Sequence, residues 1–452
     1  MAKVFNKDMT QGNEAMHIIR FALPMLAGNL LQQLYNVVDT IIVGKYLGKD
    51  ALAAVGATGS MTFLFYSISL GLAVGAGVII SQFYGAGLIE RVKSAIFNSA
   101  IVTAVLSAIM SIVSVILTRP MLTLLGTPDK ILNSSVGYMQ IACAGTIAVA
   151  AYNWINSVMR CLGDSKTPLF FLGFASIMNV ALDLLFVVKF SMGVNGAALA
   201  TIIAQFFAAL LSIIYGFNKN EIIKLKKEHI KYEREMAITC IKRGFPIAIQ
   251  NSMISISMIA LQRITNTFGE TIMASYTVTM RIEQLIQQPF ISLNSSLATF
   301  VGQNTGAQKP KRVIKGYHIG LKIEALLSLI VMSIFFIFGR HIVSLFVSDT
   351  EVINIGSTAI KITSCFFIFL GTIHTTRGFL NGAGDTSYAM VNGFVEVICR
   401  VIFSIILTRI PIIGYWGIWG TTCITWLVTA IISFLRYKHG AWQTKGLITA
   451  KS

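Results

Sequence analysis

The sequence predicts an all-α integral membrane protein with twelve transmembrane helices. Of its 452 residues, 55% are hydrophobic and only 12% are charged, whereas about 25% of the residues of a soluble domain are charged. Long apolar runs alternate with short polar or glycine- and proline-containing breaks, and about 20 apolar residues cross a bilayer. The chain therefore has room for about a dozen spans and none for a large soluble domain.

Six predicted spans precede a charged stretch and six follow it. The first six lie near 17–43, 51–82, 92–118, 132–157, 168–189 and 194–216. The last six lie near 244–265, 272–301, 313–338, 353–377, 388–409 and 414–437. Residues 217–243 are too charged to cross a membrane, and we expect a linker helix on the surface there. The predicted domains are a six-helix lobe at 1–216, a basic cytoplasmic linker at 217–243 and a second six-helix lobe at 244–452.

The net charge of +17 indicates membrane topology rather than a nucleic-acid partner. Most lysines and arginines lie in the connections that share one side with the N-terminus, and basic residues are enriched on the cytoplasmic side of membrane proteins. Residues 1–14 are polar, so we expect no cleavable signal peptide. The prediction is a multi-pass protein of the plasma membrane with both termini in the cytoplasm, in contact with membrane lipid and functional as a monomer.

An internal repeat relates the two halves at an offset of about 221 residues. It pairs Gln82 with Gln303 and Arg91 with Arg312, and it continues from Gly163-Asp164 to Gly384-Asp385. Because each half holds an even number of spans, the halves share one orientation, as in parallel transporter repeats. We therefore expect two pseudo-symmetric six-helix lobes around a central cleft.

Carboxylates inside a span are costly and are functional candidates by default. The predicted spans contain five of them: Asp39, Asp183, Glu283, Glu324 and Glu396. Asp39 follows Gln32, Tyr35 and Asn36 at helical spacing, which places all four on one face of the first span. Asp183 follows Ser176 and Asn179 in the same way on the fifth span.

Two further spans supply polar groups to the same lobe. They are Asn153 and Asn156 on the fourth span and Thr201 and Gln205 on the sixth. A buried carboxylate pair can accept a proton, a sodium ion or a cationic substrate, and competition for one pair produces antiport. The alternative is that Asp39 and Asp183 are structural, held by neighbouring amides or at an interface.

The remaining three carboxylates have competing interpretations. Glu283 lies in the stretch from Met280 to Gln284, where it has either a transport role or an arginine partner on a neighbouring helix. Met280 belongs to a group of methionines and aromatic residues that could line an adaptable pocket for lipophilic cations. Glu324 is expected to extend towards the cytoplasmic surface, and Glu396 to pair with Arg400 at i,i+4.

Catalytic and metal-binding motifs are absent from the sequence. It contains neither H-E-x-x-H nor G-x-S-x-G, and its six cysteines have no C-x-x-C spacing. We interpret the cysteines as small residues of the apolar core. The sequence therefore predicts neither an enzyme nor a bound cofactor, and it leaves a passive channel as an option that flux measurements would separate from a carrier.

Several motifs together resemble the multidrug and toxic compound extrusion (MATE) family. They run from Pro24 to Gly56, from Gln82 to Gly87, from Arg160 to Pro168, from Met280 to Gln284, from Val301 to Asn304 and from Asn381 to Thr386. The resemblance covers nearly the whole chain. It implies two six-helix lobes and export of organic, often cationic and lipophilic, compounds in exchange for sodium ions or protons.

The resemblance also implies a cation site in the N-terminal lobe. Its carboxylates and amide fall on Asp39, Asp183 and Asn179, which would also be the ligands of a sodium ion. Accessory polar positions fall on Thr201, Asn156 and Tyr138. A C-terminal acidic site known in some members has no acids here on the seventh and tenth spans. The alternative functions are a flippase for lipid-linked sugars, which would need a more basic cleft, and a narrow-substrate exporter of the same superfamily.

Overall fold

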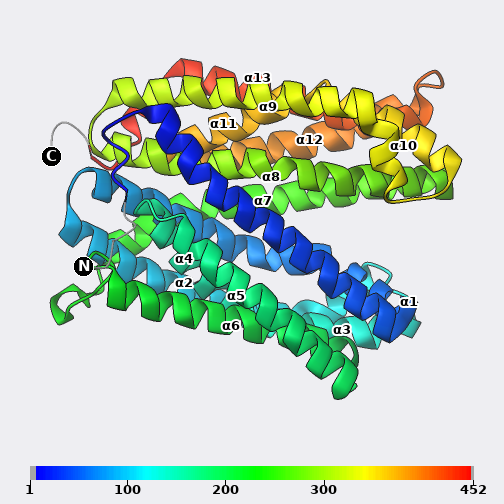
Figure 1. The fold of residues 1–452 in the computed structure, drawn as a ribbon, viewed down its shortest axis with the longest axis horizontal. Helices are drawn as coiled ribbons and strands as arrows, with labels where there is room; N and C mark the ends of the chain where they lie inside the picture. Colours follow the sequence, from blue (N-terminus) through cyan, green and yellow to red (C-terminus); the bar gives the residue numbers. More distant parts are fainter. Residues whose placement is uncertain (1–6, 449–452) are drawn as a thin grey trace. The chain divides into compact units, whose positions relative to one another are not determined.

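The structure, a computed structural model, describes residues 7–448, and this part of the chain is helical with no strand (Figure 1). The helices of the first half are α1 (Glu14–Gly85), α2 (Ile89–Leu124), α3 (Asp129–Ala144), α4 (Thr146–Cys161), α5 (Lys166–Asp183) and α6 (Gly193–Lys219). Those of the second half are α7 (Arg234–Thr265), α8 (Glu270–Gly306), α9 (Pro310–Ser344), α10 (Thr350–Ser364), α11 (Phe367–Ala383), α12 (Ser387–Arg409) and α13 (Gly417–His439).

The helices account for the twelve predicted spans. Within 7–448, eight helices are long and apolar enough to cross a bilayer, and the bent pairs α3–α4 (44°) and α10–α11 (51°) raise the number to ten. The 72 residues of α1 would extend about 108 Å, against a hydrocarbon core of about 30 Å. The α1 helix breaks at Gly48, where φ is 82°, and therefore makes two crossings. The more polar helix α8, with 37 residues, provides the twelfth crossing.

The charged connection between the halves differs from the expected linker helix. Between α6 and α7 only Lys227–His229 form a single 3-10 turn, and α7 already begins at Arg234. Lysine and glutamate are good helix formers, but this stretch is held by side chains instead. Asn98 of α2 donates to the Lys231 carbonyl oxygen at 3.2 Å and accepts from the Glu233 amide at 2.8 Å. These contacts fix an extended path that a helix could not follow.

The chain divides into two compact units. Unit 1 holds Leu23–Ile249 together with Met1–Asp8, of which Lys7 and Asp8 are described, and unit 2 holds Met9–Ala22 and Gln250–Ser452. The first turns of α1 thus belong to unit 2, and the first turns of α7 belong to unit 1. This exchange is reciprocal, because the first turns of the corresponding helix of each half belong to the other unit.

Close backbone contacts hold the exchanged turns in place. In unit 1, a Cβ atom added to Gly75 would lie 2.4 Å from the Gly244 Cα, and one added to Gly71 would lie 2.6 Å from the Ala248 Cα. In unit 2, the Ser296 hydroxyl donates to the Ile18 carbonyl oxygen at 2.7 Å. Small residues at such points let two helices approach closely, which is how membrane helices associate without a hydrophobic driving force.

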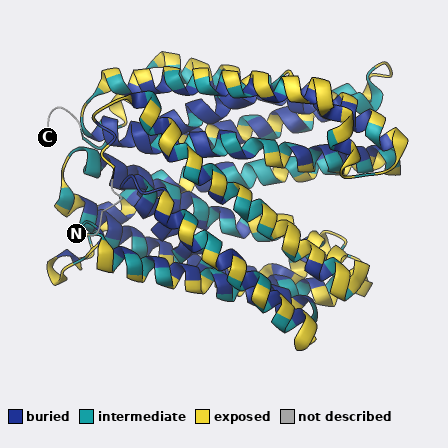
Figure 2. Ribbon diagram, viewed as in Figure 1, coloured by how far each residue is buried: buried dark blue, intermediate teal, exposed yellow. Residues whose placement is uncertain are grey.

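Each unit has an inward-facing buried surface and an apolar outer surface. Figure 2 shows that helix faces turned towards neighbours of the same unit are buried, while the opposite faces are exposed. The exposed positions include large apolar side chains such as Ile116 (68%) and Ile177 (75%), as expected for surfaces that lie against lipid. Five of the six cysteines are buried as predicted, but Cys365 is exposed and so is not a core residue.

Candidate cation and substrate site

The two predicted carboxylates of unit 1 come together. Asp39 lies on the first span of α1 and Asp183 ends α5, and their carboxyl groups are within hydrogen-bonding reach of each other. Asp183 is fully buried and Asp39 is partly buried. Two carboxylates that lie close together in a buried place cannot both stay ionised at low cost, because their like charges repel. The geometry thus favours binding of one positive charge by the pair.

Thr201 of α6 connects the two polar faces. Its hydroxyl oxygen accepts from the Tyr35 hydroxyl and from the Asn179 side-chain amide, both at 3.3 Å, and it donates to the Ala197 carbonyl oxygen at 3.1 Å. These bonds use the Tyr35 hydroxyl hydrogen and one of the two N–H groups of the Asn179 amide. The carbonyl oxygen of the Asn179 side chain is buried and accepts no hydrogen bond.

Several buried oxygens at this point have no hydrogen-bond partner. They are Asp39 Oδ1, both carboxylate oxygens of Asp183 and Asn179 Oδ1. A set of carboxylate and amide oxygens suits a hard cation, since such ions bind oxygen ligands, and it suits a proton equally. Across 7–448, no group of three or more His, Cys, Asp or Glu side chains is arranged to hold a metal ion. Any sodium ion here would therefore need the Asn179 amide as its third ligand.

The backbone changes conformation immediately after Asp183. Residues Leu184–Lys189 form a π-helical turn that continues α5. Such turns are rare and occur mainly where a side chain must be displaced from its helical position, often at functional sites. The widened turn lies next to the carboxyl pair, and nothing in the residue spacing predicts it.

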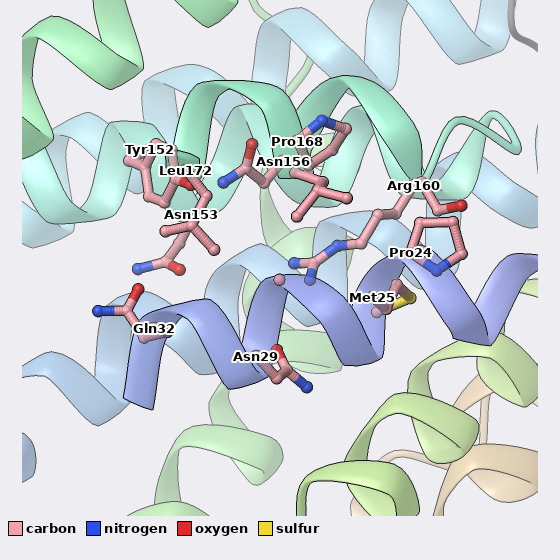
Figure 3. A pocket seen from close by; sticks show the side chains of 13 residues that line it. Pro24, Met25, Asn29, Gln32, Tyr152, Asn153, Asn156, Arg160, Pro168 and Leu172 are labelled. Carbon is pink, nitrogen blue, oxygen red and sulfur yellow. The ribbon is translucent and has the colours of Figure 1, made fainter. Parts of the chain in front are cut away.

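A polar cavity of about 140 Å3 adjoins this cluster inside unit 1. Its polar lining comes from Gln32 of α1 and from Asn153, Asn156 and Arg160 of α4. Figure 3 shows Gln32 and Asn153 facing each other across the cavity, and the Arg160 side chain extending from α4 towards α1. Gln32 also lines a narrow crevice with Tyr35, Asn179 and Gln205, so the cavity leads towards the carboxyl pair.

The other predicted residues of the N-terminal lobe take different positions. The Gln205 carbonyl oxygen is buried without a partner in the crevice. Asn36 is exposed on α1 and accepts from the Gln32 amide at 3.5 Å. Tyr138 packs on the apolar cluster formed by Ile42, Val43, Val187 and Ala197, about one helical turn beyond the carboxyl groups. The structure therefore gathers Gln32, Tyr35 and Gln205 near the pair and leaves Asn36 at the rim.

Glu283 and Met280 lie in a separate cavity of about 20 Å3 in unit 2. Arg400 of α12 lines the same cavity, and its guanidinium group donates to the Met258 sulfur at 3.1 Å. Gln284 is exposed and lies outside the cavity lining. The structure places an arginine of α12 in the same cavity as Glu283, and both interpretations of Glu283 stay predictions.

Two carboxylates depart from their predicted surroundings. Glu396 pairs with Arg377 of α11 at 2.9 Å and not with Arg400, whose guanidinium group donates instead to the Met258 sulfur at 3.1 Å. Glu324 does not extend to the surface: it is only 1% exposed, and both of its carboxylate oxygens are buried without partners. A Cβ atom added to Gly371 of α11 would lie 2.9 Å from the Glu324 Cβ, so α11 packs closely against this side chain.

Arg160 is the main residue of the cavity that the sequence interpretation missed. It lies three residues beyond the predicted end of the fourth span. It follows Asn156 by four residues and Asn153 by seven, which is the spacing of one helix face. Extending the polar stripe of the fourth span by one turn would have placed Arg160 beside these amides.

The comparisons with known proteins agree with this fold. The MatE family model matches residues 24–185 and 246–406, which is most of the chain in two segments. The chain belongs to the MatE family. The members of this family are transporters, so the MatE chain is a multi-pass membrane transporter and not an enzyme. The two matched segments also correspond to the two halves of the internal repeat.

Curated relatives align with nearly the full length of the MatE chain. The Probable multidrug resistance protein YpnP of Bacillus subtilis is 28% identical over 445 residues, covering 98% of this chain and 99% of the relative. The Probable multidrug resistance protein NorM of Thermotoga maritima is 26% identical over 440 residues, covering 96% and 94%.

Solved structures share the fold of the MatE chain. A crystal structure of MATE in complex with MaL6 has a TM-score of 0.90 at 23% identity, covering 98% of this chain and all of the other. An outward-facing multidrug resistance MATE family transporter of the MOP superfamily has a TM-score of 0.91 at 22% identity, covering 98% and 99%. The predicted all-α fold with two related six-helix halves is confirmed.

Proposed function

We propose that this chain is a secondary multidrug exporter that exchanges organic, often cationic compounds for protons or sodium ions. The carboxyl pair Asp39–Asp183 carries the proposal, because it is a buried acceptor of one positive charge inside a transporter of this family. The names of the relatives, which are multidrug resistance and multidrug export proteins, support drugs as substrates.

In this mechanism the coupling ion and the substrate compete for the same negative charge. A proton or a sodium ion bound by Asp39 and Asp183, with the Asn179 oxygen as a third ligand, would neutralise the pair and favour release of a cationic substrate. Asn156 and Thr201 hold the surrounding polar groups in place. In a plasma membrane with the termini in the cytoplasm, each unit charge moved inward gains about 2.3 kcal/mol per 100 mV. The lobes at 1–216 and 244–452 would alternate access to the site, and neither an additional cofactor nor a second subunit is needed.

A flippase for lipid-linked sugars has less support. A diphosphate would require several basic side chains in one cavity, whereas the cavities of the two units contain one arginine each, and Arg400 already donates to the Met258 sulfur. A narrow-substrate exporter remains the alternative outcome of the test below.

Ethidium efflux tests the proposal in a bacterial strain that lacks its own pumps. We expect Asp39→Asn and Asp183→Asn each to reduce efflux to the level of the empty vector at matched membrane expression, since an amide cannot bind and release the coupling charge. Asp50→Asn is the matched control, because this carboxylate is 51% exposed and pairs only with Lys130 on the surface. Replacing sodium by N-methylglucamine then identifies the ion.

The possible outcomes separate the alternatives. Wild-type efflux in both amide variants would disprove the assignment of the coupling site. No efflux from the wild-type protein would favour a narrow-substrate or lipid carrier.

A further inference from the structure

Arg160 has no protein partner for its charge. It lies in the last turn of α4 and lines the cavity of unit 1, yet its guanidinium group makes no ion pair and no hydrogen bond within the described part of the chain. Two other helical arginines do pair with acids: Arg377 with Glu396 at 2.9 Å, and Arg436 with Asp385 at 2.8 Å. A cation removed from water without a partner is costly.

The surroundings of Arg160 contain no carboxylate. The other polar groups of the cavity are neutral amides and hydroxyls, including Gln32, Asn153 and Asn156, and the apolar wall includes Met25, Leu169 and Leu172. The Asp164 carboxylate, four residues further on, accepts hydrogen bonds from the backbone amides of Lys166 and Thr167 at 3.0 Å. It therefore binds the first turn of α5 and not Arg160. The cavity thus combines one free guanidinium group with apolar and amide surface.

The internal repeat shows that the connection between α4 and α5 does not require a basic residue at the position of Arg160. At the offset of 221 residues, Arg160 corresponds to Asn381 of α11, and Asp164 corresponds to Asp385. The same connection is therefore built in unit 2 without an arginine at this position. The charge of Arg160 is a property of the unit 1 cavity rather than of the repeated fold.

We propose that Arg160 binds the carboxylate of an exported organic anion or zwitterion. A guanidinium group presents a planar pair of N–H donors that matches a carboxylate in bidentate geometry, and the apolar wall accommodates the organic body that carries it. This subsite rests on the proposed function, because it assigns a substrate class to the same transporter. It makes Arg160 a specificity-determining residue.

The position of the subsite selects molecules with two opposite charges. Gln32 lines both the Arg160 cavity and the crevice of Tyr35 and Asn179 next to the carboxyl pair. A zwitterion whose carboxylate contacts Arg160 therefore directs its remaining atoms towards Asp39 and Asp183. An organic cation without a carboxylate uses only the second of these contacts. The alternative role of Arg160 is structural, as a basic residue that offsets the dipole at the C-terminal end of α4.

Binding of two matched dyes to the purified protein separates these roles. The free-acid and methyl-ester forms of one rhodamine share the cationic ring system and differ only in the carboxylate. We expect Arg160→Gln to weaken binding of the free acid about tenfold or more, as for loss of a hydrogen bond to a charged group, and to leave binding of the ester within about twofold. Arg160→Lys should lose part of the free-acid affinity, since it keeps the charge but not the bidentate geometry. Arg91→Gln, which removes a surface arginine paired with Glu233, should change neither.

Binding is measured on the full-length protein by fluorescence anisotropy. A single size-exclusion peak shows that each variant is folded. An equal loss for both dyes would indicate a structural role and overturn the subsite, as would an unchanged affinity for the free acid. If Arg160→Gln does not fold, a competition experiment on the wild-type protein replaces it. Benzoate should displace the free-acid dye, and methyl benzoate should not. Failure of benzoate to compete would overturn the proposal. Binding needs no ion gradient, so a protein that discriminates the dyes but exports no ethidium would disprove the proposed function and leave the subsite standing.

Discussion

At the residue scale, Glu324 shows an acid that the fold encloses completely. It is only 1% exposed in α9, and Gly371 of α11 brings the backbone of the neighbouring helix against it. Neither carboxylate oxygen has a hydrogen-bond partner within the described chain. Burying an unsatisfied polar group costs about 1–3 kcal/mol, so this side chain reduces the stability of unit 2.

We expect Glu324→Met to raise the thermal stability of the purified protein. Methionine has a similar shape and length, and replacing an unpartnered polar group by an apolar one removes the cost of its burial, about 1–3 kcal/mol. The melting temperature in detergent measures the change. Glu351→Gln, at an exposed position in the first turn of α10, is the control and should have little effect. A lower melting temperature for Glu324→Met would show that the carboxyl group has a stabilising partner.

Spacing along one helix predicted which polar residues share a face, and partners across helices could not be predicted. The pattern of Gln32, Tyr35 and Asp39 follows from 3.6 residues per turn, and the carboxyl pair that it predicted does form. The partner of Arg400 depends instead on how α12 is rotated against α7. A sequence shows Glu396 one turn away from Arg400, but it does not show that the guanidinium group donates to the Met258 sulfur of another helix.

At the scale of the elements, a close contact between glycines of α1 and α7 holds the first turns of α7 in unit 1. Gly75 of α1 lies against Gly244 so closely that an added Cβ would be 2.4 Å from the Gly244 nitrogen and from its Cα. Contacts below 3.0 Å with backbone atoms cannot be relieved by moving a side chain. The first turns of α7 are therefore held in unit 1 by the absence of a side chain at this point.

We expect Gly75→Ala to destabilise the protein by about 1–3 kcal/mol, the cost of overpacking a well-packed interface. Gly56→Ala is the matched control within the same helix, because nothing lies within 4 Å of the Cβ that it would add. That variant should gain up to about 1 kcal/mol, since alanine is the better helix former. Thermal unfolding of both variants in the same detergent measures the difference. Equal effects of the two substitutions would contradict the role of the close contact.

The helices themselves were predictable where hydropathy is strong, and their interruptions were not. All twelve predicted spans correspond to helices, of which only α8 is too polar to pass as a span by hydropathy. The bend at Gly145 and the π-helical turn at Leu184–Lys189 have no signal in hydropathy. The linker was predicted as a helix from its composition, whereas Asn98 binds its backbone in another conformation. Tertiary hydrogen bonds override propensity in such short segments.

At the scale of the whole molecule, surface ion pairs mark the two ends of unit 1. At one end, Lys130 pairs with Asp50 at 2.7 Å. At the other end, Arg91 pairs with Glu233 at 3.1 Å, and His229 contacts Glu90 at 2.7 Å. The second span of α1 runs from the first end to the second. The basic linker therefore lies at the end opposite to Lys130, and the enrichment of basic residues in the cytoplasm predicts that the linker end is inside.

Cysteine labelling in intact bacteria tests this orientation. In a Cys365→Ser background, which removes the exposed native thiol, we expect Lys130→Cys to react with a membrane-impermeant maleimide and Lys227→Cys to react only after the cells are opened. Both positions are exposed lysines next to a carboxylate, and Lys227 belongs to the single 3-10 turn of the linker, so their intrinsic reactivities are comparable. Labelling of Lys227→Cys from outside, with protection of Lys130→Cys, would reverse the topology. The inward direction of the coupling ion would then run from the linker end towards Lys130.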